Sequence, residues 1–444
     1  MQLASFTTVS SVRCDRAVVW RASLYSRNSI YHGHLPNTMF DFMSLRNSNY
    51  KNDFRYTVQI HKFILGLIGV WPVLEQSWHR KRLLKRLLNC VCYFLLSFSL
   101  IPWALCMFLI IDTFKARLKM CGAFCLYTMA PAVYCTLVYQ EDRIKECLRH
   151  VEEDWRNVRD VNDRKIMLDK AKAGRFILIT TTLFLFTCGF TYRLIQPIAR
   201  GNIIVNENLT IRQLVQGNYY IFFDPQQSPA YEIVFSVQCM AGIVIYMITA
   251  SVCGITALFT MHACGQLQML ISWLENLADD DEIWKNHVAS RRLASIIMHH
   301  VRICKFLHRI QDIVGETCFI EIVGYTLILC LLGYYIITGW ERNDAISMLT
   351  YTIMLISFTF NIFILCYIGE VLSSQGNKLS TTCCTVNWYC LPNKKARYFI
   401  FVIAMANCPM KIRANKFIDL SFSSFGAVIR TAMAYFNLLR TVTM

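Results

Sequence analysis

The sequence is poor in charged residues, which make up 17% of its 444 positions, whereas soluble domains carry about 25%. Acidic residues are the scarcer kind: 29 Asp and Glu stand against 45 Lys and Arg, giving a net charge of +16. Such an excess is common in nucleic-acid-binding proteins, but here the basic residues lie between long apolar runs. With 55% hydrophobic residues and a mean hydropathy of +0.37, the composition indicates a membrane protein and argues against a nucleic-acid partner.

Motifs of enzymes and metal sites are also missing. The chain has no HExxH, no GxSxG and no glycine-rich phosphate loop, so we expect no enzymatic activity and no cofactor. Its 20 cysteines include two close pairs, Cys90/Cys92 and Cys383/Cys384, that lack the spacing of a zinc site. We therefore expect no bound metal. The segment 196–232 contains no cysteine, so no disulfide should staple it.

Long apolar runs are abundant. About twenty apolar residues cross a bilayer, and seven segments approach or meet this length: 87–111, 120–139, 176–195, 233–261, 317–340, 345–369 and 418–440. The sequence thus predicts an all-α membrane protein with seven transmembrane helices in one domain, 87–444, preceded by a cytoplasmic segment, 39–86. The apolar run at 398–410 is too short to span and should pack against protein.

Basic residues predict the orientation of these spans, because cytoplasmic connections are enriched in Lys and Arg. The segment before the first span and the second, fourth and sixth connections are rich in them. The alternate connections are poorer and hold Lys115, Arg117, Lys119, Arg193, Arg200, Arg212 and Arg342. The N-terminus is therefore predicted to be cytoplasmic and the C-terminus extracellular, opposite to a rhodopsin-like receptor. Asn208 begins an Asn-Leu-Thr glycosylation sequon in a loop that this rule places outside.

Two ionisable residues interrupt the spans, and such residues are functional candidates by default. Glu321 lies near the cytoplasmic end of the fifth span, and we expect it to reach the membrane interface. Arg430 lies near the middle of the last span, where it could reach water in a conduit or pair with another helix.

The cytoplasmic connections themselves have helical patterns. Ile144, Leu148, Val151, Trp155 and Val158 recur at helical spacing within 141–172. Such a stripe needs a partner, which could be the same chain or another subunit. The pattern predicts a cytoplasmic helical anchor below the membrane.

The first residues differ in character from the rest. Segment 1–38 is rich in Arg and Ser and has no apolar periodicity. We interpret it as a disordered basic extension or as an artefactual start upstream of Met39 or Met43.

The last eighty residues contain an ordered set of short motifs: LCYIGE at 365–370, NWYCLP at 387–392, CPM at 408–410, KFIDLS at 416–421 and AYFNLLRTV at 434–442. Their order and spacing resemble the C-terminal signature of the insect odorant receptors. The resemblance implies an odorant-gated, non-selective cation channel in the plasma membrane of sensory neurons. It also implies a heterotetramer with the odorant co-receptor. This chain lacks the long second intracellular loop typical of that co-receptor, so it resembles the tuning subunit.

Two alternatives remain at this stage. A gustatory receptor, a related channel, usually ends in a Thr-Tyr…Gln-Phe element, whereas Tyr435 is followed here by Phe436 and no Gln-Phe. A secondary transporter would be favoured by inverted repeats with broken spans, which the sequence lacks.

Candidate site residues follow from helical spacing, from the predicted orientation and from the resemblance. Thr431, Tyr435, Leu438 and Val442 fall on one stripe of the last span. The resemblance implies that this helix lines the pore, with Leu438 and Val442 as an apolar gate and Thr441 near the mouth. Small volatile organic ligands should bind in the outer half of the bundle, and membrane lipid is a further expected partner. The residues predicted there are Phe124, Phe190, Thr191, Phe235, Gln238, Met348, Tyr351 and Thr352.

Overall fold

The structure is a computed structural model that describes residues 47–72, 79–200, 203–206, 209–212, 214–215, 220, 225–278, 287–341, 343–386, 388–390 and 393–443. Segment 1–38 and Asn208 lie outside these residues, so the predictions made for them stay predictions. The described part is almost entirely helical, with two short antiparallel strand pairs.

The helices of the N-terminal half are α2 (Tyr50–Leu67), α3 (His79–Leu105), η3 (Cys106–Ile110), α4 (Phe114–Tyr139), α5 (Glu141–Asn157), α6 (Val161–Phe190), η4 (Thr191–Ile195) and α7 (Gln196–Arg200). The hairpin of β1 (Ile203–Asn206) and β2 (Leu209–Ile211) follows, with Ile203 opposite Ile211. The C-terminal half contains α8 (Ala230–Ala278), α9 (His287–Glu341), α10 (Ala345–Thr385), η6 (Trp388–Cys390), α11 (Asn393–Ala406), β3 (Arg413–Ala414), β4 (Ile418–Asp419) and α12 (Phe422–Thr443). Both η3 and η4 are π-helical turns.

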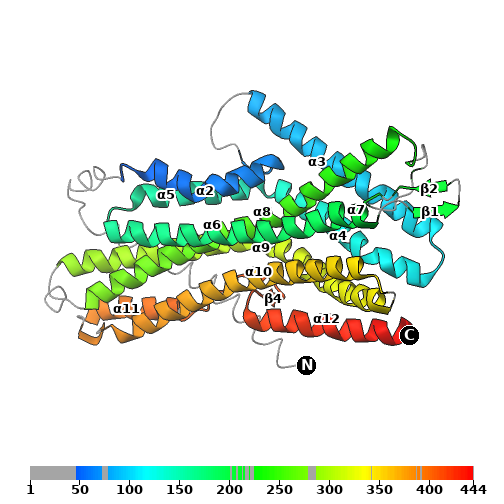
Figure 1. The fold of residues 1–444 in the computed structure, drawn as a ribbon. Helices are drawn as coiled ribbons and strands as arrows, with labels where there is room; N and C mark the ends of the chain where they lie inside the picture. Colours follow the sequence, from blue (N-terminus) through cyan, green and yellow to red (C-terminus); the bar gives the residue numbers. More distant parts are fainter. Residues whose placement is uncertain are drawn as a thin grey trace.

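The long helices run side by side in one elongated bundle (Figure 1). Helix α8 is its centre, because it packs on α6, α10, α9, α2 and α3. Its sequence is apolar all round rather than on one face, as expected for a helix surrounded by protein. From Val252 to Leu267 every residue of α8 is buried.

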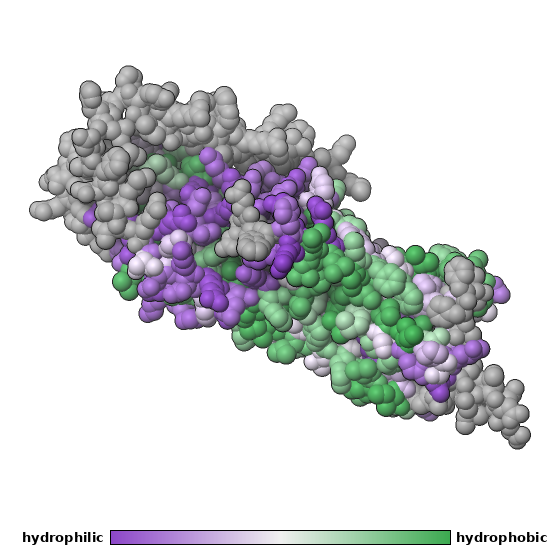
Figure 2. All heavy atoms as spheres, turned by 90° about the horizontal axis from the view of Figure 1, so that it is seen from above, coloured by the Kyte–Doolittle hydropathy of each residue, from purple (hydrophilic) through white to green (hydrophobic). Residues whose placement is uncertain are grey.

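Six helices of the described part are long and apolar enough to cross a membrane; they begin at His79, Phe114, Val161, Ala230, Arg292 and Ala345. Helix α12 is not among them, although its 22 residues give a length of about 33 Å. Hydrophobic residues gather over one part of the surface, between a large hydrophilic region and a smaller hydrophilic tip (Figure 2). This distribution fits a multi-pass membrane protein.

The helices α8, α9 and α10 have 49, 55 and 41 residues, about twice what a bilayer requires. They therefore continue past the membrane, and α5 packs on α8 and α9 there. The stripe predicted on α5 is buried against its own chain, which settles the question of its partner: Ile144, Leu148, Val151 and Trp155 are each at most 1% exposed. Helix α11 is also packed on the bundle, as predicted for 398–410, with Phe399 and Val402 buried.

Ion pairs fasten α5 to the long helices. The Asp154 carboxylate lies 2.9 Å from His262 Nε2 of α8 and 2.7 Å from Arg302 Nη2 of α9. Burial raises the pKa of Asp154, but His262, His150 and Arg302 outweigh it and hold the pKa below its usual value. In a similar way, Asp53 of α2 accepts two hydrogen bonds from Arg164 of α6, at 2.7 and 2.8 Å. These ion pairs join α5 to α8 and α9, and α2 to α6, at the inner end of the bundle.

Candidate ligand site and pore helix

Residues of the C-terminal motifs make the contacts that hold the start of α12 in place. The Oγ of Ser421 caps the helix by accepting a hydrogen bond from the backbone N–H of Ser424 at 3.3 Å. Glu370 of α10 accepts the backbone N–H of Phe422 at 3.2 Å, and a carboxylate is favourable at a helix N-terminus. Asp419 pairs with Lys411 and Arg413, each at 2.9 Å. These contacts hold the N-terminal end of α12 against α10.

Close packing on glycine sets the position of α12. A Cβ on Gly369 would lie 2.2 Å from the carbonyl oxygen of Leu420, so only glycine allows this approach. Further along, Phe436 packs over Gly333 of α9, where a Cβ would meet its ring at 3.3 Å. Val428 and Ala432 are buried on the same side of α12. One face of this helix therefore belongs to the core of its own chain.

The rest of the α12 surface is open, and it carries all the predicted pore residues. Thr431 and Thr441 are exposed, and Tyr435, Leu438 and Val442 are 49%, 60% and 65% exposed. Arg430 and Asn437 are exposed on this helix as well, and charged or amide side chains are unfavourable in contact with lipid. The face is therefore suited to water or to another subunit.

A buried cation marks the outer half of the bundle. Arg193 stands at the end of the predicted third span and was counted with the outer connection, whereas the structure buries its side chain in the bundle. The π-helical turn η4 turns its side chain inward, where it is 5% exposed. Its guanidinium donates to the backbone oxygen of Gln238 and to the hydroxyl of Tyr127, both at 2.7 Å. Removing Arg193 from the outer connection makes the charge asymmetry between the two sides larger, so the predicted orientation stands on firmer ground.

Two of the predicted ligand residues lie beside this cation. Gln238 of α8 is fully buried, and its side-chain amide donates to the Tyr220 hydroxyl at 3.3 Å. Thr191, in the same π turn as Arg193, is also buried, but its hydroxyl bonds to the backbone oxygen of Thr187 in its own helix. Gln238 thus has a polar environment, whereas Thr191 has its hydroxyl already satisfied.

Two others lie near a second polar point, formed by Tyr335 of α9. The Tyr335 hydroxyl donates to the Leu118 backbone oxygen at 2.8 Å and accepts from the Gly122 N–H at 2.9 Å. Its ring centroid is 5.4 Å from that of Tyr351. Met348 packs at the end of α9, against Gly339. Tyr335 ties α4 to α9 here, and the sequence analysis missed it.

The remaining predicted ligand residues are scattered. Phe124 meets Phe108 of η3 edge-on at 6.1 Å, and Phe235 stacks on Tyr231 of its own helix at 6.1 Å. Thr352 is half-buried and bonds to the backbone oxygen of Met348. Phe190 is 58% exposed and points away from the bundle.

The expectation for Glu321 was also wrong. Its side chain does not reach the interface: it is 0% exposed, and neither carboxyl oxygen has a hydrogen-bond partner within the described residues. It lies on the face of α9 that meets α8, one turn from Tyr325, whose hydroxyl pairs with Thr249 at 3.0 Å. The sequence showed where Glu321 lies along the helix, but not which side of the helix its side chain occupies.

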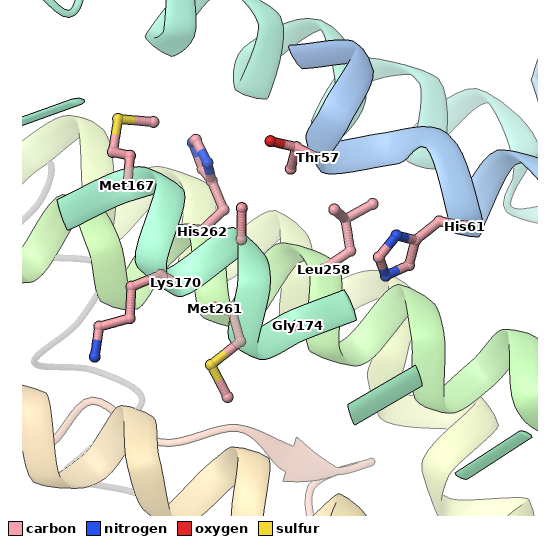
Figure 3. A pocket seen from close by; sticks show the side chains of 9 residues that line it. Thr57, His61, Met167, Lys170, Gly174, Leu258, Met261 and His262 are labelled. Atoms are coloured by element: carbon pink, nitrogen blue, oxygen red, sulfur yellow. The ribbon is translucent and has the colours of Figure 1, made fainter. Parts of the chain in front are cut away.

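A small cavity lies near the inner end, between α2, α6 and α8 (Figure 3). Its volume of about 10 Å³ has room for about one water molecule. His61 lines it with both ring nitrogens unpartnered among the described residues. Burial lowers the pKa of His61 to about 4, so the ring is neutral. The cavity is too small for an organic ligand.

Comparison with known proteins identifies the family. A family model described as 7tm Odorant receptor matches residues 118–433, which is well over half of the chain. The chain belongs to the odorant receptor family. This confirms the resemblance seen in the C-terminal motifs.

Individual odorant receptors are distant in sequence. Odorant receptor 13a of Drosophila melanogaster is 26% identical over 250 residues, covering 50% of this chain and 59% of the relative. Odorant receptor 82a of the same species is 22% identical over 274 residues, covering 61% of this chain and 70% of the relative. The match to the first of these spans about three fifths of its length.

Solved structures share the fold. The insect olfactory receptor OR5 from Machilis hrabei, solved in complex with eugenol, superposes with a TM-score of 0.71 at 16% identity. The match covers 89% of this chain and 100% of that receptor. The predicted fold class, an all-α bundle of seven transmembrane helices, is confirmed.

Proposed function

We propose that this odorant receptor is the tuning subunit of an odorant-gated, non-selective cation channel in the plasma membrane of sensory neurons. It would bind a small volatile organic ligand in the outer half of the bundle and assemble with the odorant co-receptor as a heterotetramer. The lateral surface of the bundle would face membrane lipid. The OR5 relative, solved with eugenol, supports a small organic ligand.

The main support for the proposal is that α12 is packed on one side and exposed on another. One side is held to α9 and α10, while the other exposes Thr431, Tyr435, Leu438, Thr441 and Val442. If several copies of this helix surround an axis, the apolar members of that side form rings. Such rings can close a pore by excluding water, and no charged plug is needed.

Whole-cell currents test this proposal. Cells that express the chain with the co-receptor should give cation currents in response to members of a volatile panel. Cells with the co-receptor alone should not respond to the same members. Robust volatile-gated currents from this chain alone would contradict its role as a tuning subunit, and saturable uptake without current would reject a channel.

A further inference from the structure

Arg193 carries a positive charge in the interior of the bundle. Besides its two hydrogen bonds, the guanidinium lies 6.0 Å from the ring centroid of Tyr127 and 5.8 Å from that of Tyr246. Both tyrosines are buried. Cation–π contacts of this length are weak when single, so they only partly replace the water that the charge has lost.

This charge has no counter-ion among the described residues. None of the ion pairs within 4.0 Å involves Arg193. A guanidinium has five N–H groups, and Arg193 uses two of them. Its Nε is buried without an acceptor. Buried charges are usually paired, so an anion would supply a partner that the described residues do not.

The surrounding chain makes space for this side chain. A Cβ on Gly242 of α8 would lie 1.9 Å from Arg193 Nε, so the guanidinium lies directly over that glycine. Gly189 accommodates the Tyr246 ring in the same way, with a Cβ distance of 2.3 Å. The π-helical turn η4 supplies the inward direction, and such turns are frequent at functional sites. Three separate features thus place one cation in the outer half.

We propose that Arg193 is the polar contact of the ligand site and that the chain binds volatile carboxylic acids as their carboxylates. This rests on the proposed function and specifies its ligand class. A carboxylate would accept the free N–H groups of the guanidinium, a pairing that is charge-assisted and can be bidentate. Tyr127, Tyr246 and Trp103, whose ring lies 6.3 Å from that of Tyr127, would supply aromatic surface for the acyl chain.

A structural role for Arg193 is the competing interpretation. In that case the side chain only clamps η4 to α8 through Gln238, and its replacement weakens every response alike. The two interpretations predict different ratios of potency between an acid and an uncharged ligand of similar shape. The test therefore measures that potency ratio rather than the response to one ligand.

The experiment compares hexanoate with methyl hexanoate and hexanol in cells that express the chain with the co-receptor. The proposal predicts that hexanoate is at least about tenfold more potent than its ester, as agonist or competitive inhibitor, because hydrogen bonds to charged groups contribute about 1.5–3 kcal/mol. Arg193→Gln should abolish this preference while ester responses persist. Arg193→Lys should retain part of it. The control Arg212→Gln removes an exposed outer cation that pairs with Glu232 and should leave the preference unchanged.

Tyr127→Phe keeps the charge and frees one N–H group, so it provides a second test if Arg193→Gln does not reach the surface. It should preserve or increase the preference for hexanoate. Equal potency of acid and ester in the wild-type channel, or an equal loss for both in Arg193→Gln, would overturn the proposal. A channel that opens to no volatile of any class would instead reject the proposed function.

Discussion

Shortening Leu438 should cause the channel to leak without odorant. Leu438→Ala removes three carbon atoms, and a buried methylene contributes about 0.8 kcal/mol. In the isolated chain this side chain is 60% exposed, so a closed ring could still bury about that fraction of it. The loss is therefore about 1.4 kcal/mol for each copy of the chain, which shifts the closed–open equilibrium about tenfold toward the open state.

The assay is the basal cation current of co-receptor-containing cells, normalised to the amount of receptor at the surface. Val442→Ser, one turn further on, should leak as well because it introduces a hydroxyl into the ring. Leu439→Ala is the matched control, since Leu439 packs against the core of its own chain. Basal current and ion selectivity that stay at wild-type values in both pore variants, at normal surface levels, would remove α12 from the pore.

Three further predictions concern topology and packing. A C-terminal epitope should stain intact cells, and glycosidase should reduce the mass of the wild type but not of Asn208→Gln; staining only after permeabilisation would reverse the topology. Gly369→Ala introduces a Cβ 2.2 Å from a backbone oxygen and should destabilise the protein by about 1–3 kcal/mol. Gly426→Ala, which meets nothing within 4 Å, should be neutral, and equal thermal stability of the two would refute the packing. Asp154→Ala removes the buried partner of His262 and leaves Arg302 only its exposed contact with Glu153, so it should lower stability by about 3–5 kcal/mol, whereas Glu153→Ala, at an exposed site, should change the melting temperature little.

The helical membrane fold was predictable because six of its spans are long apolar segments, a local property of the sequence. The open face of α12 was predictable for a similar reason: small and polar residues alternate with apolar ones at helical spacing. Helix lengths beyond the membrane were harder to define, since charged residues there pair with other helices and leave only a weak pattern. Asp154, for example, is in sequence only the last of three consecutive acidic residues, and it is the packing of the helices that brings it to His262 and Arg302.

The errors at Arg193 and Glu321 have one physical cause. Position along a helix can be read from sequence, but rotation about its axis depends on the neighbouring helices. A π-helical turn adds a residue and changes that rotation locally, which is how Arg193 turns inward at the end of α6. The signal that could have identified it was a lone arginine at the end of an apolar run, next to aromatic residues. Glu321 offered no comparable signal, because its neighbours are apolar on every side.

Cysteine accessibility on α12 tests most directly whether its open face lines the ion pathway. Leu438→Cys and Thr441→Cys place thiols on that face, and Leu439→Cys places one on the packed side. A membrane-impermeant thiol reagent, applied from outside during odorant stimulation, should reduce the current through the first two channels. It should leave Leu439→Cys and the wild type, with its 20 native cysteines, unchanged. Currents through Leu438→Cys and Thr441→Cys channels that resist the reagent as the wild type does would contradict a pore lined by α12.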